Sequence, residues 1–184
     1  MNFTQDWFSN NISNFNKCMT ELPSKKSFLE IGAFEGRATC WLLENGLSTD
    51  GRIVCVDSFT HISVDPNMDF KAVEARFWFN TAETRKGTQV VSLMKMPSNK
   101  ALAELIGHRA EFDFIYVDGS HAPDVALSDA CMSWGLLKQG GVMLFDDYEY
   151  PLEPTKIGID GFLEAFGGKY KTIIKNYQYG IKKL

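Results

Sequence analysis

Four short apolar segments, each ending in a glycine or an aspartate, constrain the fold of this chain more than any other feature. They are residues 27–32, 52–57, 112–118 and 142–147. Near-continuous apolar runs of this length are typical of strands that are buried on both faces. Because such strands occur in parallel sheets that helices cover on both sides, the pattern predicts an α/β fold.

Helices and further strands are expected between and after these segments. Four helices are expected: residues 37–45, about 101–106, about 123–137, and one within residues 58–89 that carries Phe70, Val73, Phe77, Trp78 and Phe79. Three further strands are expected, at residues 90–94, 170–175 and 178–183, with a tight turn between the last two. The chain should therefore form a Rossmann-like three-layer sandwich, with a mostly parallel seven-stranded sheet and a C-terminal antiparallel hairpin.

The N-terminal region carries a helical pattern of its own. Phe8, Ile12, Phe15 and Met19 recur at intervals of four, three and four, which marks one face of a helix. We interpret residues 1–22 as a helical extension of a single domain that spans residues 1–184. The length suits one domain, and no repeat or linker interrupts it.

Charge and cysteine content limit the classes of partner. The net charge of −4 provides no basic field for a nucleic-acid backbone. No apolar run reaches the length of a membrane span, and the first residues lack a signal-peptide pattern. The four cysteines are widely spaced, which favours small buried thiols over a metal site. We expect a soluble cytoplasmic protein that acts on a small molecule and binds neither nucleic acid nor membrane. A homo-oligomer is compatible with the sequence.

The turn after the first strand and the acid after the second favour a nucleoside-bearing cofactor. Gly32 and Gly36 let the backbone turn sharply between a strand and a helix, where a ligand can approach the main chain. A tight turn without a ligand would need the same glycines. Asp57 lies 21 residues after Gly36 and can accept hydrogen bonds from both ribose hydroxyls, although a turn aspartate is the plainer alternative.

The charge of this turn favours one cofactor over another. A dinucleotide site prefers the spacing Gly-x-Gly-x-x-Gly, which the turn lacks. Glu30 and Glu35 would also repel a pyrophosphate. S-adenosylmethionine, with its sulfonium and its amine, suits these acids better.

Four motifs together resemble the class I S-adenosylmethionine-dependent methyltransferases. They lie at residues 28–36, 53–57, 112–121 and 140–147. The Asp-Gly-Ser-His sequence at 118–121 and the Asp-Asp pair at 146–147 are similar to a bacterial group of small-molecule O-methyltransferases, which includes macrocin-type and cephalosporin-biosynthesis enzymes. The resemblance covers roughly residues 27–147.

The resemblance implies roles for individual residues in and near these motifs. The methionine end of the cofactor would be framed by Glu30, Gly32, Ala33, Phe34 and Gly36. The ribose and adenosine would lie along Asp57, Ser58 and Phe59, and the adenine near Met96 and Ser98. Asp118 would lie where the methionine moiety meets the acceptor. Pro97 stands where the family often has an acid, and it cannot supply the same contact.

The acids at the ends of the fourth and fifth strands suggest a metal site. If these strands are neighbours, Asp118, Asp146 and Asp147 lie within about 5 Å of one another and repel unless a cation separates them. Hard oxygen ligands suit Mg²⁺, with Ca²⁺ or Mn²⁺ as alternatives. The alternative is one acid on the cofactor side and one helix-capping acid, without a metal.

His121 is the candidate general base. It follows Asp118 by three residues, at the entry to a helix, and its ordinary pKa near 6.5 suits removal of a proton from an acceptor. A capping or surface histidine is the plainer interpretation. His61 and His108 receive no role.

Residues 58–89 and 148–154 are expected to form the acceptor pocket, because the chain has no separate substrate domain. The leading hypothesis is a metal-assisted O-methyltransferase that acts on a sugar or natural product. The alternatives are a metal-independent methyltransferase, a nicotinamide-dependent oxidoreductase and a cofactor-binding module without activity.

Overall fold

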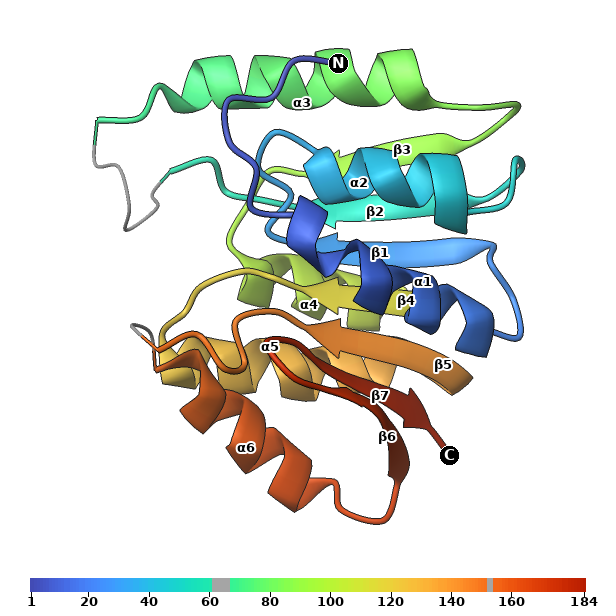
Figure 1. Cartoon of the computed structure of the whole chain (residues 1–184), viewed down its shortest axis with the longest axis vertical. Coiled ribbons are helices and arrows are strands. Elements are labelled where there is room, and N and C mark those ends of the chain that lie inside the picture. Colours follow the sequence, from blue (N-terminus) through green and yellow to red (C-terminus); the bar gives the residue numbers. More distant parts are fainter. Residues whose placement is uncertain (61–66, 152–153) are drawn as a thin grey trace.

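In the described part of the chain, which is residues 1–60, 67–151 and 154–184 of a computed structural model, seven strands form one mixed sheet (Figure 1). The order across the sheet is β3-β2-β1-β4-β5-β7-β6. The strands are β1 (Ser27–Ile31), β2 (Arg52–Val56), β3 (Val90–Met94), β4 (Phe112–Val117), β5 (Leu137–Phe145), β6 (Tyr170–Lys175) and β7 (Tyr179–Lys183). Strands β1 to β5 run parallel, and β7 pairs antiparallel with both β5 and β6. The expected fold class is confirmed.

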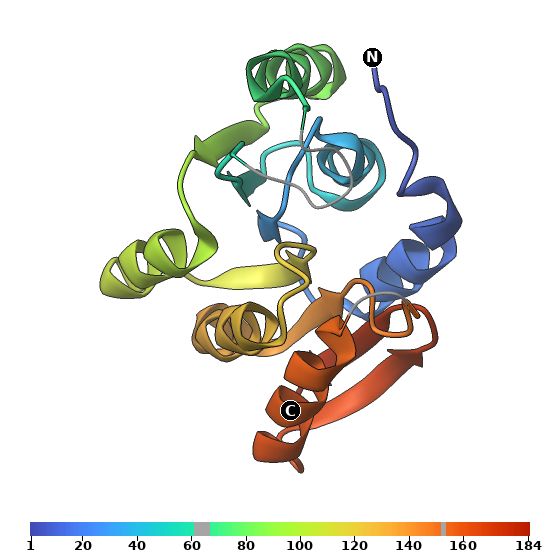
Figure 2. The same cartoon turned by 90° about the vertical axis from the view of Figure 1, so that its left-hand side faces the viewer.

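Helices cover both faces of this sheet (Figure 2). They are η1 (Ser9–Asn11), α1 (Ile12–Glu21), α2 (Arg37–Trp41) with its π-helical continuation η2 (Leu42–Gly46), α3 (Phe70–Thr84), α4 (Ser98–Gly107), α5 (Pro123–Leu136) and α6 (Thr155–Ala165). Helices α1, α2 and α3 contribute to one apolar core, and α4, α5 and α6 contribute to the other.

Strand β1 shows why the apolar runs form a central sheet. All five of its residues are buried. Phe28 belongs to the core under α1 and α2, whereas Leu29 and Ile31 belong to the core under α4 and α5. Alternate side chains thus serve opposite faces, as a doubly covered strand requires.

Several boundaries differ from those expected. The helical extension expected at residues 1–22 is shorter in the structure. A 3-10 turn covers Ser9–Asn11, and the first α-helix covers Ile12–Glu21. Strand β5 begins at Leu137 rather than Val142, because α5 leads directly into it. The left-handed conformation of Gly140, with φ of 75°, lies within this longer strand.

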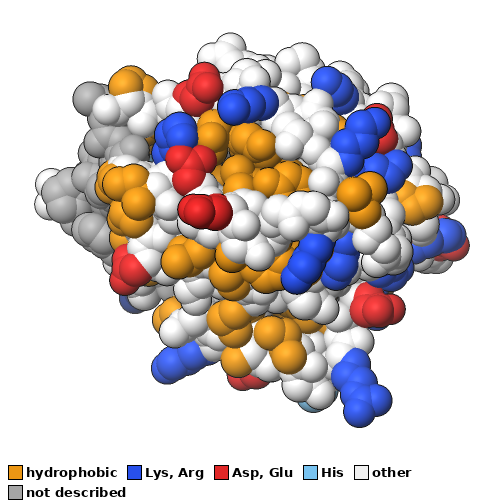
Figure 3. Space-filling model, turned by 90° about the horizontal axis from the view of Figure 1, so that it is seen from below, with side chains coloured by type: hydrophobic (Ala, Val, Ile, Leu, Met, Phe, Trp, Pro, Cys, Tyr) orange, Lys and Arg blue, Asp and Glu red, His pale blue; other side chains and the backbone are white. Residues whose placement is uncertain are grey.

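No helix in the part of the chain described combines the length and the apolar character needed to cross a bilayer. The face around α6 and the hairpin carries apolar side chains among basic and acidic ones (Figure 3), and Ile157 of α6 is 67% exposed. In α3, Val73 and Phe77 enter the core, whereas Trp78 and Phe79 are exposed.

Candidate functional site

The carboxyl ends of β1, β2, β4 and β5 meet at one edge of the sheet, as expected from the sequence. Three backbone hydrogen bonds continue the pairing past the strands themselves. Gly32 N donates to Val56 O at 2.8 Å, Asp118 N to Ile31 O at 2.9 Å, and Asp146 N to Val117 O at 2.9 Å. The glycine turn, Asp57, Asp118 and the pair Asp146-Asp147 therefore lie along the same edge.

Gly32 can be nothing larger than glycine. Its φ is +87°, and a Cβ atom there would lie 1.7 Å from the carbonyl oxygen of Asp118. Gly36 has a φ of +79°, with the ring of Phe77 3.0 Å from its would-be Cβ. Both glycines occupy the left-handed region that side chains disfavour. The first of them lets the turn pack directly against the loop that carries Asp118.

Asp57 organises the turns on either side of it. Its Oδ2 accepts a hydrogen bond from the backbone N–H of Phe34 at 2.8 Å, and its Oδ1 accepts one from Phe59 at 2.7 Å. Both donors have positive φ, 45° for Phe34 and 49° for Phe59, which is uncommon for residues other than glycine. The backbone N–H of Ala33 also donates to this carboxylate. A carboxylate has about four lone-pair sites, so acceptor capacity remains beside these three donors. Burial raises the pKa of Asp57. Asp57 can thus hold the turn after β1 and still accept a hydrogen bond from a hydroxyl.

Glu30 is buried beneath the same turn. Its Oε2 accepts a hydrogen bond from Thr39 Oγ1, and Cys55 Sγ lies 3.7 Å away. Burial raises the pKa of Glu30 to about 8, which makes this group responsive to a nearby cation.

Glu35 has a different role from the one expected. Its carboxylate forms an ion pair with Arg76 at 2.5 Å and accepts hydrogen bonds from the backbone and hydroxyl of Thr4. The charge of Glu35 is therefore balanced by α3 and the N-terminal segment. Glu30 is therefore the acid of this turn that could favour a cationic cofactor.

The other expected cofactor contacts lie beside this turn. Ala33 is buried, Ser58 shares a hydrogen bond with Thr60 at 2.8 Å, and the ring of Phe59 packs against Phe77 with centroids 6.3 Å apart. Met96 is half-buried at the end of β3.

Ser98 begins α4, and its hydroxyl is hydrogen-bonded to Asp129 of α5. Asp129 is buried, and its burial raises the pKa to about 6. No pattern in the sequence singled out this acid, which lies beside the residue expected to border the adenine. His61 and part of the expected 148–154 overhang lie outside the described residues.

The acidic cluster consists of Asp118, His121 and Asp147, whose ligand atoms all lie within 4.8 Å of one another. Tyr116 Oη donates to Asp118 Oδ2 at 3.0 Å. His121 Nε2 lies 3.0 Å from Asp147 Oδ2, with the imidazole one-third exposed. The arrangement brings two carboxylates and an imidazole to one point.

Asp146, the third acid expected to bind metal, has other partners. Its Oδ1 accepts hydrogen bonds from Asn11 Nδ2 at 3.2 Å and from Gln178 Nε2 at 2.5 Å. These donors come from the N-terminal helical region and the start of the last strand. Asp146 thus lies beside the cluster, and His121 is the third member of the cluster in its stead.

Burial and mutual repulsion shift the pKa values of these acids. Burial, followed by the charges of Asp146 and Asp147, holds the pKa of Asp118 well above its ordinary value. Burial and the charge of Asp147 raise the pKa of Asp146 to about 7. Burial would also raise the pKa of Asp147, but hydrogen bonds from His121 and Tyr177 outweigh it and lower the value. A cation placed here would relieve the repulsion.

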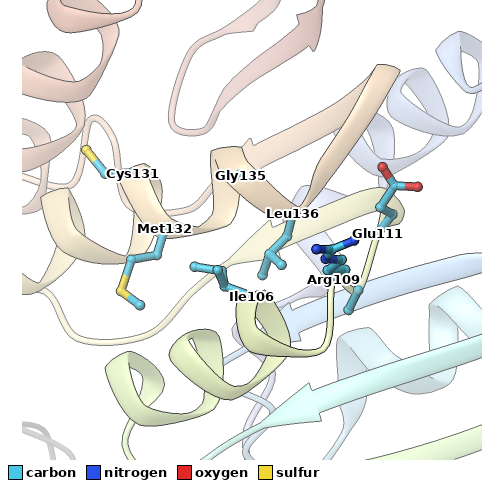
Figure 4. A pocket seen from close by; sticks show the side chains of 8 residues that line it. Ile106, Arg109, Glu111, Cys131, Met132, Gly135 and Leu136 are labelled. Atoms are coloured by element: carbon cyan, nitrogen blue, oxygen red, sulfur yellow. The ribbon is translucent and has the colours of Figure 1, made fainter.

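A pocket of a different kind lies at the opposite edge of the sheet (Figure 4). This groove of about 510 Å³ lies between the ends of α4 and α5 and the start of β4, and its lining includes Arg109, Glu111 and Met132. A second, small cavity lies beside the acidic cluster, between the loop at Asp118–His121 and Thr155 of α6. Only the second contains residues expected to act in catalysis.

Comparison with known proteins agrees with this geometry. Residues 29–148 match a family model described as a methyltransferase domain. No curated protein matches the chain. Among solved structures, an O-methyltransferase from Bacillus cereus in complex with SAH is similar, with a TM-score of 0.68 and 17% identity over 98% of this chain and 84% of that one.

Two further structures extend the comparison. TomG, an O-methyltransferase from Streptomyces achromogenes involved in tomaymycin synthesis and solved with SAM, has a TM-score of 0.65 and 20% identity over 96% of this chain and 80% of its own. A proposed rRNA methylase from Clostridium thermocellum has a TM-score of 0.66 and 14% identity, covering 99% and 98% of the two chains. Identities this low establish the fold. Since the family model matches most of the sequence, the chain belongs to the methyltransferase family and has the fold of its S-adenosylmethionine-dependent members.

Proposed function

We propose that this protein transfers a methyl group from S-adenosylmethionine to a hydroxyl of a small molecule. The observation that carries the proposal is the single edge on which the Asp57 turn adjoins the cluster of Asp118, His121 and Asp147. The similar structures named as O-methyltransferases with SAM or SAH give it support.

The cofactor would lie across the turn after β1. Asp57 would accept the ribose hydroxyls, Glu30 would face the cationic methionine end, and Met96 and Ser98 would border the adenine. The bound cofactor supplies a methyl group on a sulfonium. The protein must then align the acceptor with that methyl, exclude water and take up the hydroxyl proton.

The cluster fits a divalent cation. Asp118 and Asp147 offer hard oxygen donors. A positive charge between them is favoured because Asp118 is repelled by the carboxylates of Asp146 and Asp147. We propose Mg²⁺, with Mn²⁺ and Ca²⁺ as alternatives, held by Asp118 and Asp147 with Asp146 or His121 beside them. A bound cation would lower the pKa of an acceptor hydroxyl.

A metal-independent transferase is the second candidate, and the contact between His121 and Asp147 favours it. At 3.0 Å, Asp147 can orient the imidazole and stabilise its protonated form, so that His121 removes the acceptor proton unaided. In this mechanism Asp147 is a partner of the base, whereas in the first it is a metal ligand.

Calorimetry separates these roles. The D57A variant should lose most of its affinity for SAH and keep its affinity for Mn²⁺, and D147A should do the reverse. D50A provides a matched control, because Asp50 is exposed and pairs with Lys26 on the surface. Equal losses of both ligands in D57A and D147A would contradict the assigned roles. Wild-type activity that survives a chelator would favour the second candidate.

The acceptor class needs its own assay. The net charge of −4 favours a small molecule over RNA, which is the substrate that the name of the Clostridium protein implies. Transfer of labelled methyl to a pool of hydroxylated metabolites, but not to total RNA, is the expected result. A cytoplasmic location belongs to the same proposal, since the four cysteines are free thiols.

A further inference from the structure

The turn between β6 and β7 reaches the acidic cluster. Tyr177 lies in this turn, and its hydroxyl donates a hydrogen bond to Asp147 Oδ1. His121 occupies the other oxygen, Oδ2. Both oxygens of Asp147 are therefore held, one by a loop that follows β4 and one by the C-terminal hairpin.

The two neighbours of Tyr177 fix the turn in place. Asn176 Nδ2 donates to Asn14 Oδ1 of α1 at 3.2 Å, and Asn14 Nδ2 donates to Gln178 Oε1 at 3.0 Å. Gln178 is buried and donates to Asp146 at 2.5 Å. The N-terminal helix and the end of β5 thus hold the residues on both sides of Tyr177.

Tyr177 itself is tied to the loop that follows β5. Its carbonyl oxygen accepts a hydrogen bond from Glu149 N at 3.2 Å, and its ring packs edge-on against Tyr150 with centroids 6.3 Å apart. Its side chain nevertheless stays 40% exposed beside the cluster. A side chain that needed only to fill space would not require an oriented hydroxyl and an anchored turn.

We infer that Tyr177 is a positioning residue of the active site, which holds Asp147 in the orientation that the cluster uses. The inference rests on the proposed function, because it gives Asp147 a role in catalysis. A carboxylate that binds a metal or orients a histidine needs an outer partner to fix its rotation. The Tyr177 hydroxyl provides that partner in either mechanism.

The test compares Y177F with Y170F. Y177F removes the hydroxyl and keeps the ring. Tyr170 lies at the other end of the same hairpin, and its hydroxyl donates to Leu163 O at 3.1 Å, so Y170F is a matched control. Mn²⁺ affinity, measured by calorimetry on the SAH-bound protein, should fall about tenfold or more in Y177F. SAH affinity should stay unchanged in both variants.

A second readout does not require metal. Diethyl pyrocarbonate modifies histidine, and mass spectrometry reports the rate at His121. Loosening Asp147 should make modification of His121 faster in Y177F than in wild type and in Y170F. If the wild type binds no Mn²⁺, the metal part of the proposed function fails, and this rate alone decides the role of Tyr177. Two results would overturn the inference. The first is that Y177F binds Mn²⁺ as tightly as wild type does. The second, if the wild type binds no Mn²⁺, is that diethyl pyrocarbonate modifies His121 at the same rate in Y177F as in wild type.

Discussion

Replacing Glu30 by glutamine should remove a pH-dependent weakness of the fold. Glu30 is 1% exposed, and burial raises its pKa from an ordinary 4.5 to about 8. Between these values the folded protein keeps the carboxyl neutral while the unfolded chain ionises it. Rising pH in this window therefore favours unfolding, because the unfolded state binds fewer protons.

The size of the effect follows from the shift. Each pKa unit corresponds to about 1.4 kcal/mol, so the free energy of unfolding should fall by up to about 5 kcal/mol through this group by pH 9. Glutamine keeps an oxygen that can accept the hydrogen bond from Thr39 and cannot ionise. E30Q should therefore gain stability relative to wild type as pH rises, by several kcal/mol between pH 5 and pH 9 on the same scale.

Urea unfolding followed by circular dichroism at pH 5, 7 and 9 measures this difference. E44Q is a suitable control, because Glu44 is exposed in η2 and should leave the pH profile as in wild type. A constant stability difference between E30Q and wild type across this range would refute the reasoning, since Glu30 would then be ionised in the folded protein.

The same carboxyl links stability to cofactor binding. SAH lacks the sulfonium of S-adenosylmethionine but keeps its cationic amine. This amine would favour the ionised form of Glu30 if it lay beside it, so SAH binding at pH 7 should release up to one proton in wild type and none in E30Q. Calorimetry in buffers of different ionisation enthalpy counts these protons. Equal proton release by both proteins would place the cofactor charge away from Glu30.

Three further substitutions test the frame of the site. G32A should destabilise the fold by more than about 3 kcal/mol, or prevent soluble expression, because the new Cβ would lie 1.7 Å from Asp118 O; thermal unfolding measures this. D113N should cost about 1–3 kcal/mol at pH 7, since buried Asp113 accepts two backbone hydrogen bonds and pairs with a lysine. Although burial opposes them, these contacts lower its pKa, so the deficit of D113N in urea unfolding should shrink as pH falls through that lowered value. R76A should cost about 1–3 kcal/mol by leaving buried Glu35 without its ion pair, which chemical denaturation at pH 7 reports.

The sheet was predictable because its signals are local. Short apolar runs indicate buried strands. In any parallel arrangement, the residue that ends each run lies at the carboxyl edge of the sheet. The placement of Gly32, Asp57, Asp118 and the 146–147 pair therefore followed from the sequence. The helix boundaries followed less well, because tertiary packing and not periodicity decides where α1 begins and where α5 passes into β5.

The contacts that complete the site join residues far apart in the chain. Asn11 reaches Asp146 across 135 positions, and Gln178 reaches the same carboxylate from the opposite end of the sequence. Neither residue belongs to a recognisable sequence motif. An asparagine in a helix and a glutamine beside a turn are ordinary surface residues until the fold buries them against an acid. The contact of Tyr177 with Asp147 could not be predicted for the same reason.

The Asp-Asp pair shows how backbone conformation assigns roles that identical side chains cannot. Asp146 follows β5 and directs its carboxylate to Asn11 and Gln178, which hold the N-terminal helix and the last strand against the sheet edge. Asp147 adopts a φ of 53°, in the left-handed region, and its carboxylate meets His121 and Tyr177 instead. Consecutive residues in extended conformation would also point apart, but only the left-handed turn brings the second acid to the loop after β4. Strain of this kind persists where surrounding contacts compensate for it. Under the proposed function, Asp147 is therefore the member of the pair that would act in the chemistry, and Asp146 is the member that holds the N-terminal region and the hairpin in place.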